Sequence, residues 1–380
     1  MHQLLSLSLI IIWFLITSYT LFTIVLQVLW QRLRVYPENA ELTDFITIII
    51  PVRNEEKGIF ELLSDLNQQT YPARQFEVLV MDDGSTDTTA SIVLKCSEEF
   101  NIDIRLITLP DNPTTSPKKR AIETAIAQAR GNLIVTTDGD CRAGKGWLKA
   151  FAECHFSSKA KLISGPVTFL EEGSLTDHLQ TVEFSSLIGS GASAISAGYP
   201  SLCNGANLAY EKEIFNEVGG YDGVRHIASG DDEFLMHKIA DKYPDGIRFL
   251  KSSEAIVRTQ AHQDWQIFFR QRKRWASKWK HYQSKTPLAL ALYVFCCNLS
   301  LIVSVLLFFT GNLSGISFIF LVMLKFIPEW IFLGNVLNFL GKRRSIPYIP
   351  LTQIIYPFYV CFFGLAAQKP EYEWKGRKLV

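Results

Sequence analysis

The uncharged apolar stretch from Leu4 to Trp30 is the feature that most limits how this chain can fold. Crossing a bilayer takes roughly 20 apolar residues, so this stretch is long enough for a membrane-spanning helix. A cleaved signal peptide would need a shorter apolar core, a basic start and a small-residue cleavage site, and the stretch has none of these. We therefore expect an uncleaved N-terminal transmembrane helix over residues 1–31.

Three further apolar segments follow a polar middle, and we expect residues 287–368 to form a C-terminal membrane region with two or three spans. The segments are Leu288 to Phe309, Ile316 to Leu340 and Ile346 to Ala367. Lys325 and Glu329 in the second segment can pair on one helix face. A charged pair inside a membrane faces either other protein or a functional cavity. A structural role, in which the two side chains pair with each other, is as good an interpretation here as a functional one. Prolines in the third segment make a kinked or interfacial helix the alternative to a full span.

Short basic flanks indicate how these segments are oriented. The flanks are Arg32 and Arg34, His281 to Lys285, and Gly341 to Arg344. The positive-inside rule places all three in the cytoplasm. We therefore expect a multi-pass protein of the cell (inner) membrane with residues 31–287 in the cytoplasm. Four full spans would put the basic tail, residues 369–380, on the outside against the same rule, so the side of the C-terminus stays open.

Charge and cysteine content exclude two classes of protein. The formal net charge is +1, and the chain has no basic domain, zinc-ligand spacing or tandem repeat, so we expect no nucleic-acid partner. The seven cysteines are odd in number and show no paired spacing, which fits reduced thiols better than a disulfide framework.

The polar middle alternates strand and helix patterns up to residue 140, which predicts an α/β fold with a mostly parallel sheet. The expected strands are Phe45 to Ile50, Glu77 to Met81 and Asn132 to Thr136. The expected helices carry apolar residues from Ile59 to Leu66, a cap at Asp87, and Pro117 in a first turn. Residues 141–260 look less regular, with a Gly-rich turn at Gly189 to Gly198.

Two acidic motifs stand at expected strand ends, where ligands bind in such sheets. Asp138 and Asp140 point the same way if the chain stays extended. A hard divalent cation favours one or two carboxylates plus phosphate oxygens, so this pair predicts a metal site for a nucleotide diphosphate. In the other motif, Asp82 or Asp83 can accept a hydrogen bond from a base or ribose, while Gly84 permits the turn. A solvated turn is the alternative for each motif.

Five motifs in order make residues 45–285 similar to the family 2 glycosyltransferases, particularly their membrane-bound members. The motifs are Ile50-Pro51-Val52-Arg53-Asn54-Glu55, Asp82-Asp83-Gly84-Ser85-Thr86-Asp87, Asp138-Gly139-Asp140, Gly230-Asp231-Asp232 and Gln271-Arg272-Lys273-Arg274-Trp275. The resemblance implies an α/β glycosyltransferase A domain inserted between transmembrane helices. It also implies inverting transfer from a nucleotide-diphosphate sugar.

The resemblance assigns roles to the donor side of the site. The residues that would border the nucleotide pocket are Pro51, Asn54 and Glu55. Asp82 or Asp83 would contact the base. Lys118 would lie near the donor, although Pro117 replaces the family's usual glycine before it. Asp138 and Asp140 would bind the divalent cation, Mg²⁺ or Mn²⁺.

The remaining catalytic candidates lie further along the chain. Asp232 matches the family's catalytic base and Asp231 is its rival, while the structural alternative is a helix cap before Phe234. The residues matching the motif that closes the site in membrane members are Gln271, Arg274 and Trp275. Arg274 would bind the diphosphate, and Trp275 would offer a flat face to the sugar or acceptor.

The same stretch also predicts an amphipathic interfacial helix over residues 262–285. Its aromatic residues Trp265, Phe268, Phe269, Trp275 and Trp279 lie among the basic residues Arg270, Arg272, Lys273, Lys278 and Lys280. A helix lying on the membrane can present the site to it, so both interpretations can hold together.

We therefore expect a membrane-integral inverting glycosyltransferase that uses a UDP- or GDP-linked sugar, with UDP favoured, and a lipid acceptor in the bilayer. A processive polysaccharide synthase with a glycan acceptor is the alternative, although three or four spans leave little room for a polymer channel. Alternatives from other classes are an inactive nucleotide sensor and a nucleotidyltransferase. The cytoplasmic domain would cover residues 44–285, with a nucleotide half at 44–165 and an acceptor half at 166–260.

Overall fold

The computed structural model describes residues 2–36, 44–110, 116–170, 173–276, 286–366, 372–374 and 377–379. The chain divides into two compact units. The α/β unit comprises Arg32–Glu171, Ser190–Ala261 and Glu373–Val380, and the helical unit comprises Met1–Gln31, Glu172–Gly189 and His262–Tyr372. The stretch Glu172–Gly189, inside the expected acceptor half, thus groups with the apolar helices at the two ends of the chain.

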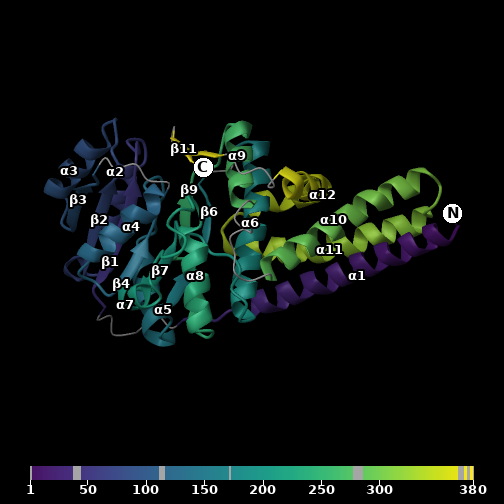
Figure 1. The fold of residues 1–380 in the computed structure, drawn as a ribbon, viewed down its shortest axis with the longest axis horizontal. Helices are drawn as coiled ribbons and strands as arrows, with labels where there is room; N and C mark the ends of the chain where they lie inside the picture. Colours follow the sequence, from purple (N-terminus) through teal and green to yellow (C-terminus); the bar gives the residue numbers. More distant parts are fainter. Residues whose placement is uncertain are drawn as a thin grey trace. The chain divides into compact units, whose positions relative to one another are not determined.

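The α/β unit is built on a seven-stranded sheet in the order β3-β2-β1-β4-β7-β5-β8, and Figure 1 labels β3, β2, β1, β4 and β7 one after another. Its strands are β1 (Ile46–Val52), β2 (Phe76–Asp82), β3 (Asp103–Thr108), β4 (Leu133–Thr136), β5 (Leu162–Ser164), β7 (Leu208–Glu211) and β8 (Ile247–Phe249). The first four are parallel, while β7 runs antiparallel to both β4 and β5. The expected α/β fold with a parallel central sheet is confirmed.

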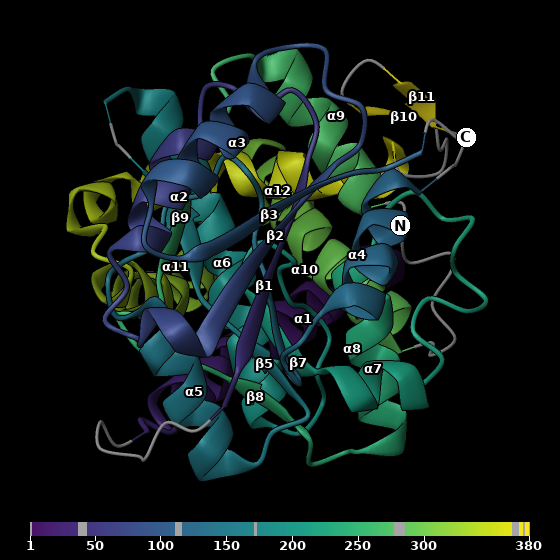
Figure 2. The ribbon, with the colours of Figure 1, turned by 90° about the vertical axis from the view of Figure 1, so that its left-hand side faces the viewer.

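Burial on both faces explains why the central strands read as continuous apolar runs. One face packs Ile46, Ile48 and Ile50 of β1 into a core with α2 (Ile59–Asn67), α3 (Thr89–Glu99) and α5 (Trp147–Ser158). The other face of β1 and β2 is covered by α4 (Pro117–Gln128), and Figure 2 shows α4 on the opposite side of the strands from α2 and α3. Pro117 occupies the first turn of α4, as expected.

Three local expectations need correction. Strand β3 was not expected, because this edge strand interrupts its apolar residues with Arg105, which pairs at 2.6 Å with Glu77 of β2. The N-cap of α3 is Thr88 rather than Asp87, although the Asp87 carboxylate still accepts a hydrogen bond from the Thr89 N–H at 3.0 Å.

Most of the expected Gly-rich turn is instead the end of a helix, α6 (Leu175–Ser196), and a turn follows only at Ala197 and Gly198, where Gly198 has φ +79°. A Cβ at Gly189 would lie 2.7 Å from Val336 and 2.9 Å from Phe332. The glycine therefore serves close helix packing within the helical unit rather than a turn.

The other elements of the α/β unit are η1 (Ala73–Gln75), β6 (Val167–Phe169), β9 (Val257–Thr259), α7 (Lys212–Glu217) and α8 (Asp231–Lys242), and β6 pairs with β9.

Among the residues that the structure describes, four helices are long and apolar enough to cross a membrane, and all four belong to the helical unit. They are α1 (His2–Gln31), α10 (Thr286–Phe309), α11 (Gly315–Phe339) and α12 (Ile349–Ala366), the last entered through η3 (Arg343–Tyr348). Figure 1 shows α1, α10 and α11 side by side. The apolar segments are thus confirmed as helices, and Pro347 lies in η3 while Pro357 lies inside α12. The short strands β10 (Tyr372–Trp374) and β11 (Arg377–Leu379) pair with each other.

The charged pair in the second C-terminal segment is buried between helices. The Lys325 Nζ donates to Glu329 Oε1 at 2.7 Å, and the Tyr19 hydroxyl of α1 donates to the same oxygen at 2.7 Å. Gln353 of α12 donates to the other carboxylate oxygen at 3.1 Å. Because every partner comes from α1, α11 or α12, the pair acts as a structural polar cluster facing other protein.

Candidate active site

The loops that follow β1 and β2 are joined to each other at the carboxyl edge of the sheet. The Asn54 N–H donates to Ser85 Oγ at 3.0 Å, and the Thr86 N–H donates to Asn54 Oδ1 at 2.8 Å. The Glu55 N–H donates to Thr89 Oγ1 at 2.8 Å. Pro51, within β1, lies opposite Met81 of β2. The expected nucleotide-pocket residues therefore form one rim with the Asp82-Asp83 motif.

The two aspartates of that motif have different partners. Asp82 accepts hydrogen bonds from the Ser85 N–H at 2.9 Å and the Ser85 hydroxyl at 2.6 Å, which closes the turn. Gly84 has φ +70°, a conformation that glycine adopts at low cost. The Asp83 carboxylate pairs with Arg120 of α4 and lies 4.0 Å from Arg53. Asp82 thus shapes the rim, while Asp83 holds it against α4.

Asp138 and Asp140 lie just beyond the end of β4, as expected. The Asp138 side chain is 38% exposed, and Asp140 is partly buried and accepts a hydrogen bond from Thr259 Oγ1 at 3.3 Å. Burial, followed by the nearby charge of Asp138, raises the pKa of Asp140 above its usual value. A bound cation would offset both effects.

This pair fits a divalent cation that is shared with a bound ligand. Across the described parts of the chain, no three His, Cys, Asp or Glu side chains gather into a closed metal-binding group. Mg²⁺ is commonly held by one or two carboxylates, with waters and substrate phosphates completing its shell. Asp138 and Asp140 supply that number of hard oxygen ligands.

Lys118, at the start of α4, connects the acidic motifs. Its Nζ donates to Asp138 Oδ1 at 2.7 Å and lies 3.4 Å from Asp231 Oδ2. Burial alone would lower the pKa of Lys118, but the charges of Asp138 and Asp231 outweigh it and raise this pKa well above its usual value. The structure thus brings a residue of the first half of the domain next to the acids of the second half.

Asp231 and Asp232 occupy the first turn of α8, where the helix dipole favours ionised carboxylates. Asp232 accepts hydrogen bonds from the Gly205 N–H at 2.9 Å and from the Glu233 N–H at 2.8 Å. A Cβ at Gly205 would lie 3.0 Å from the Asp231 carboxylate and 3.3 Å from Lys118 Nζ. This glycine therefore lets the chain approach the acids closely. The position of the two aspartates at a helix terminus is therefore compatible with a catalytic role for Asp232.

The remaining candidates belong to the helical unit, on α9 (Trp265–Ala276). Gln271 accepts a hydrogen bond from Arg272 at 2.6 Å, and the Trp275 ring lies 4.3 Å from the Arg272 guanidinium and 6.1 Å from the Phe184 ring. Arg274 follows on the same helix. Within the stretch expected to be an interfacial helix, residues 262–285, the structure has a helix from Trp265 to Ala276, and its interfacial position stays a prediction. Lys278, Trp279, Lys280 and the flank His281 to Lys285 lie outside the described residues.

Arg272 corrects the expected amphipathic pattern. The predicted pattern counts it among the basic residues of an amphipathic helix, but it is 3% exposed and donates to Glu183 of α6 at 3.0 and 2.6 Å. The Tyr359 hydroxyl of α12 donates to the same carboxylate at 2.8 Å. Arg272 therefore anchors α9 within the helical unit. Nothing in the local sequence distinguishes it from its basic neighbours.

Other residues that sequence reasoning missed surround the acidic cluster. They are Lys119, Arg120, Gly205 and Thr259. The run Lys118-Lys119-Arg120 at the start of an expected helix could have indicated Lys119 and Arg120. Three cations in a first turn oppose the helix dipole, so they need acceptors from other parts of the chain.

Comparisons with known proteins show which family the chain is similar to. The family model described as glycosyl transferase family 21 matches residues 10–380. Glycosyltransferase AglE of Haloferax volcanii is 29% identical over 197 residues, covering 52% of this chain and 62% of AglE. The probable glycosyltransferase YdaM of Bacillus subtilis is 26% identical over 247 residues, covering 63% of this chain and 56% of YdaM. The matches thus span less than two thirds of either relative.

A solved structure shares the fold. Mannosyltransferase PcManGT from Pyrobaculum calidifontis, in complex with GDP-Man and Mn²⁺, matches with a TM-score of 0.58 at 16% identity. The match covers 92% of this chain and 99% of that chain. The predicted resemblance is confirmed at the level of a family 2-like glycosyltransferase, and so are the glycosyltransferase A fold class and the enzyme class. The chain belongs to glycosyl transferase family 21.

Proposed function

We propose that this chain is a membrane-integral inverting glycosyltransferase that moves a sugar from a nucleotide-diphosphate sugar to a lipid acceptor in the membrane. The observation that carries the proposal is the meeting of Asp138 and Asp231 on Lys118, with Asp140 and Asp232 beside them, at the carboxyl edge of the sheet. The four helices of the described part of the chain that are long and apolar enough to cross a membrane support an acceptor that the bilayer delivers.

The donor would lie across the rim formed by Asn54, Glu55 and the Asp82-Asp83 motif. Asp138 and Asp140 would hold Mg²⁺ or Mn²⁺, which when bound neutralises charge on the diphosphate. The complex of PcManGT with GDP-Man and Mn²⁺ supports a nucleotide sugar with a divalent cation in this fold. Lys118 lies close enough to the pair to bind the diphosphate as well.

The acceptor hydroxyl would lose its proton to Asp232 as its oxygen bonds to the anomeric carbon. The bond from that carbon to the diphosphate oxygen breaks in the same step, and the nucleoside diphosphate leaves with the electron pair. Attack from the opposite face converts an α-linked donor into a β-linked product. The roles of Gln271, Arg274 and Trp275 in closing the site on the diphosphate rest on their motif resemblance.

The test uses the full chain in detergent, a panel of UDP- and GDP-sugars, and a membrane lipid extract. We expect release of nucleoside diphosphate with Mn²⁺ or Mg²⁺ and loss of release with EDTA. Asp232→Asn should lower turnover by 10³-fold or more, on the order of 4 kcal/mol, while nucleotide-sugar binding measured by calorimetry stays within about twofold. Asp231→Asn is the matched variant and should weaken donor binding through Lys118 instead.

The other outcomes would refute the assignment of the base or indicate a different function. Normal turnover by Asp232→Asn would refute the assignment of the base. Binding without nucleotide release would indicate a sensor, and pyrophosphate release a nucleotidyltransferase. Long products on a gel would indicate a polysaccharide synthase, whereas a single added sugar by mass spectrometry supports glycolipid synthesis.

A further inference from the structure

Lys119, the neighbour of Lys118, is a buried lysine whose ammonium binds one short segment of backbone. It is 2% exposed, and its Nζ donates to the carbonyl oxygens of Val224 at 2.8 Å, Ile227 at 2.7 Å and Ser229 at 3.1 Å. The Ser116 hydroxyl adds a hydrogen bond to the Ile227 carbonyl at 2.6 Å. An ammonium has three donors, so these carbonyls match its full capacity.

Burying a lysine is costly unless its charge and donors are satisfied. Here carbonyl dipoles satisfy the donors, and the rings of Tyr221 and Phe234 lie 5.9 and 5.1 Å from the ammonium. A shorter polar residue could not reach three carbonyls spread over six residues of chain. The burial of this cation therefore serves the geometry of the segment that it binds.

That segment, residues 218–230 between α7 and α8, leads directly into the acid pair; we call it the α7–α8 segment. It contains turns but no helix or strand, and Gly219, Gly220 and Gly223 have positive φ. Backbone of this kind needs external anchors to hold one conformation. Its start is held by Lys238, which donates to the carbonyls of Gly220 at 2.8 Å and Asp222 at 2.7 Å.

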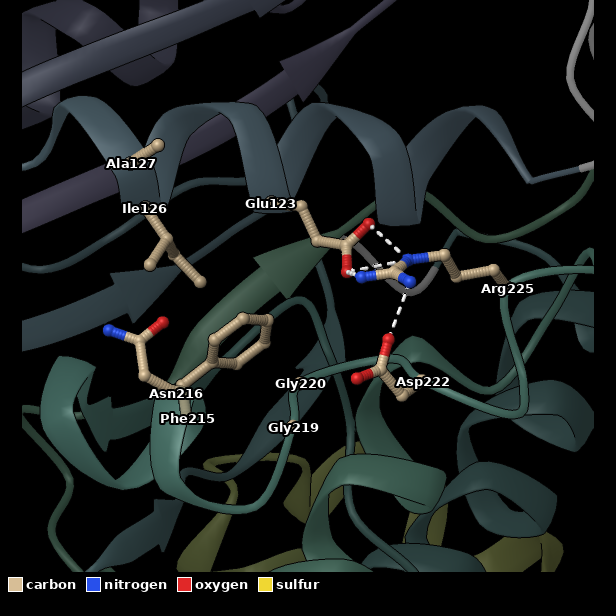
Figure 3. Close-up of a pocket in the computed structure, with 9 residues that line it drawn as sticks. All are labelled: Glu123, Ile126, Ala127, Phe215, Asn216, Gly219, Gly220, Asp222 and Arg225. Atoms are coloured by element: carbon tan, nitrogen blue, oxygen red, sulfur yellow. Dashed lines mark hydrogen bonds and ion pairs between the residues drawn. The ribbon is translucent and has the colours of Figure 1, made fainter.

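A surface ion pair holds the middle of the segment. Figure 3 shows the Arg225 guanidinium between Glu123 of α4 and Asp222. Arg225 is 59% exposed, so this contact is worth little by comparison with buried ones. The last residues before Asp231, in contrast, are held by Ser116 and Lys119 in the buried interior.

We propose that Lys119 is a positioning residue for the catalytic acids. Consecutive helix residues point about 100° apart, so α4 aims Lys118 at Asp138 and Asp231 while Lys119 holds the backbone just before Asp231. The start of α4 thus sets the distance between Asp138, on the side that would bind the cation, and Asp232, the proposed base. The inference rests on the proposed role of Asp232 as that base.

The experiment compares Lys119→Met with Lys238→Met, which removes the lysine that binds two carbonyls at the far end of the same segment. We expect Lys119→Met to lower kcat by about 10- to 100-fold, as small misplacements of catalytic groups do, with donor affinity within about twofold of wild type. Lys238→Met should lower kcat less than about threefold. Ser116→Ala, which removes one of the bonds to Ile227, should lower kcat in the same direction but less than Lys119→Met.

Several results would overturn the proposal: equal kcat losses in Lys119→Met and Lys238→Met, or a loss of donor affinity that accounts for the whole effect of Lys119→Met. Should Lys119→Met fail to fold, unchanged kcat in a folded Ser116→Ala would overturn it. The wild type and Asp232→Asn are measured in parallel. If Asp232→Asn keeps full turnover, the proposed function fails; if it loses turnover while Lys119→Met keeps it, only the positioning role fails.

Discussion

At the residue scale, Lys118 is the cation that allows several carboxylates to gather at one edge of the sheet. It contacts Asp138 and Asp231, and Asp232 adds to the field that raises its pKa. Without a positive charge these acids would repel one another. In the proposed function, a divalent cation shared with the donor would take over part of that task, and the lysine would then be free to bind the diphosphate.

Replacing this lysine should make the fold depend on metal. We expect Lys118→Met to destabilise the metal-free protein by about 1.5–3 kcal/mol, the range for hydrogen bonds to charged groups. Mn²⁺ should then raise the melting temperature of the variant more than that of the wild type. Thermal unfolding with and without Mn²⁺ measures this, with Lys238→Met as the control. Equal Mn²⁺ shifts in all three proteins would show that Lys118 does not neutralise the acids.

At the scale of elements, α9 combines a candidate closing motif with its own structural anchor. Gln271 and Trp275 both contact Arg272, which in turn is bound to Glu183. The motif residues are therefore oriented through a neighbour that no motif pattern singles out.

Breaking this anchor should be costly because it removes the guanidinium that pairs with a buried carboxylate and leaves the Tyr359 hydroxyl as a neutral donor to it. We expect Arg272→Met to lower the free energy of unfolding by about 3–5 kcal/mol. The double variant Arg272→Met with Glu183→Gln should recover most of that loss. Arg270→Met, on the exposed side of the same helix, is the control and should stay within about 0.5 kcal/mol of wild type. Unfolding in detergent followed by tryptophan fluorescence checks this, and no recovery in the double variant would contradict it.

Elements differed in how well the sequence predicted them, and burial explains the difference. Strands β1, β2 and β4 are buried along their length, so each is a mostly apolar run that can be recognised alone, although β1 contains Thr47 and β2 contains Glu77. The edge strand β3 carries charged residues, and α6 contains glycines that serve packing against residues such as Val336. Both features depend on neighbours that are distant in sequence.

At the scale of the whole molecule, contacts between distant segments stabilise the α/β unit near its N-terminal entry. His155 of α5 lies 2.7 Å from Asp44 before β1 and 3.3 Å from Glu211 at the end of β7. Burial alone would lower the pKa of His155, but hydrogen bonds to Asp44 and Glu211 raise it to about 9. Lys161 also donates to Glu211, at 2.9 Å.

This histidine should make stability depend on pH. Its folded-state pKa lies above the unfolded value, so the folded state holds more protons between about pH 6.5 and 9. The stabilisation is complete below about pH 6.5 and is lost as the pH rises through 9. We expect the melting temperature to fall across this window, by less in His155→Gln than in wild type. His226→Gln, at an exposed position, should follow wild type; parallel curves for His155→Gln would contradict the assignment.

By itself the sequence determined the apolar helices, the central strands and the placement of acidic motifs at strand ends, because these depend on local periodicity and on the order of motifs. The tertiary structure decided which charges meet. Lys118 contacts an aspartate more than a hundred residues away, Lys119 binds the backbone before it, and Arg272 is buried. Such partners are selected by packing in space, and a basic residue that will be buried has the same local pattern as one that stays in water.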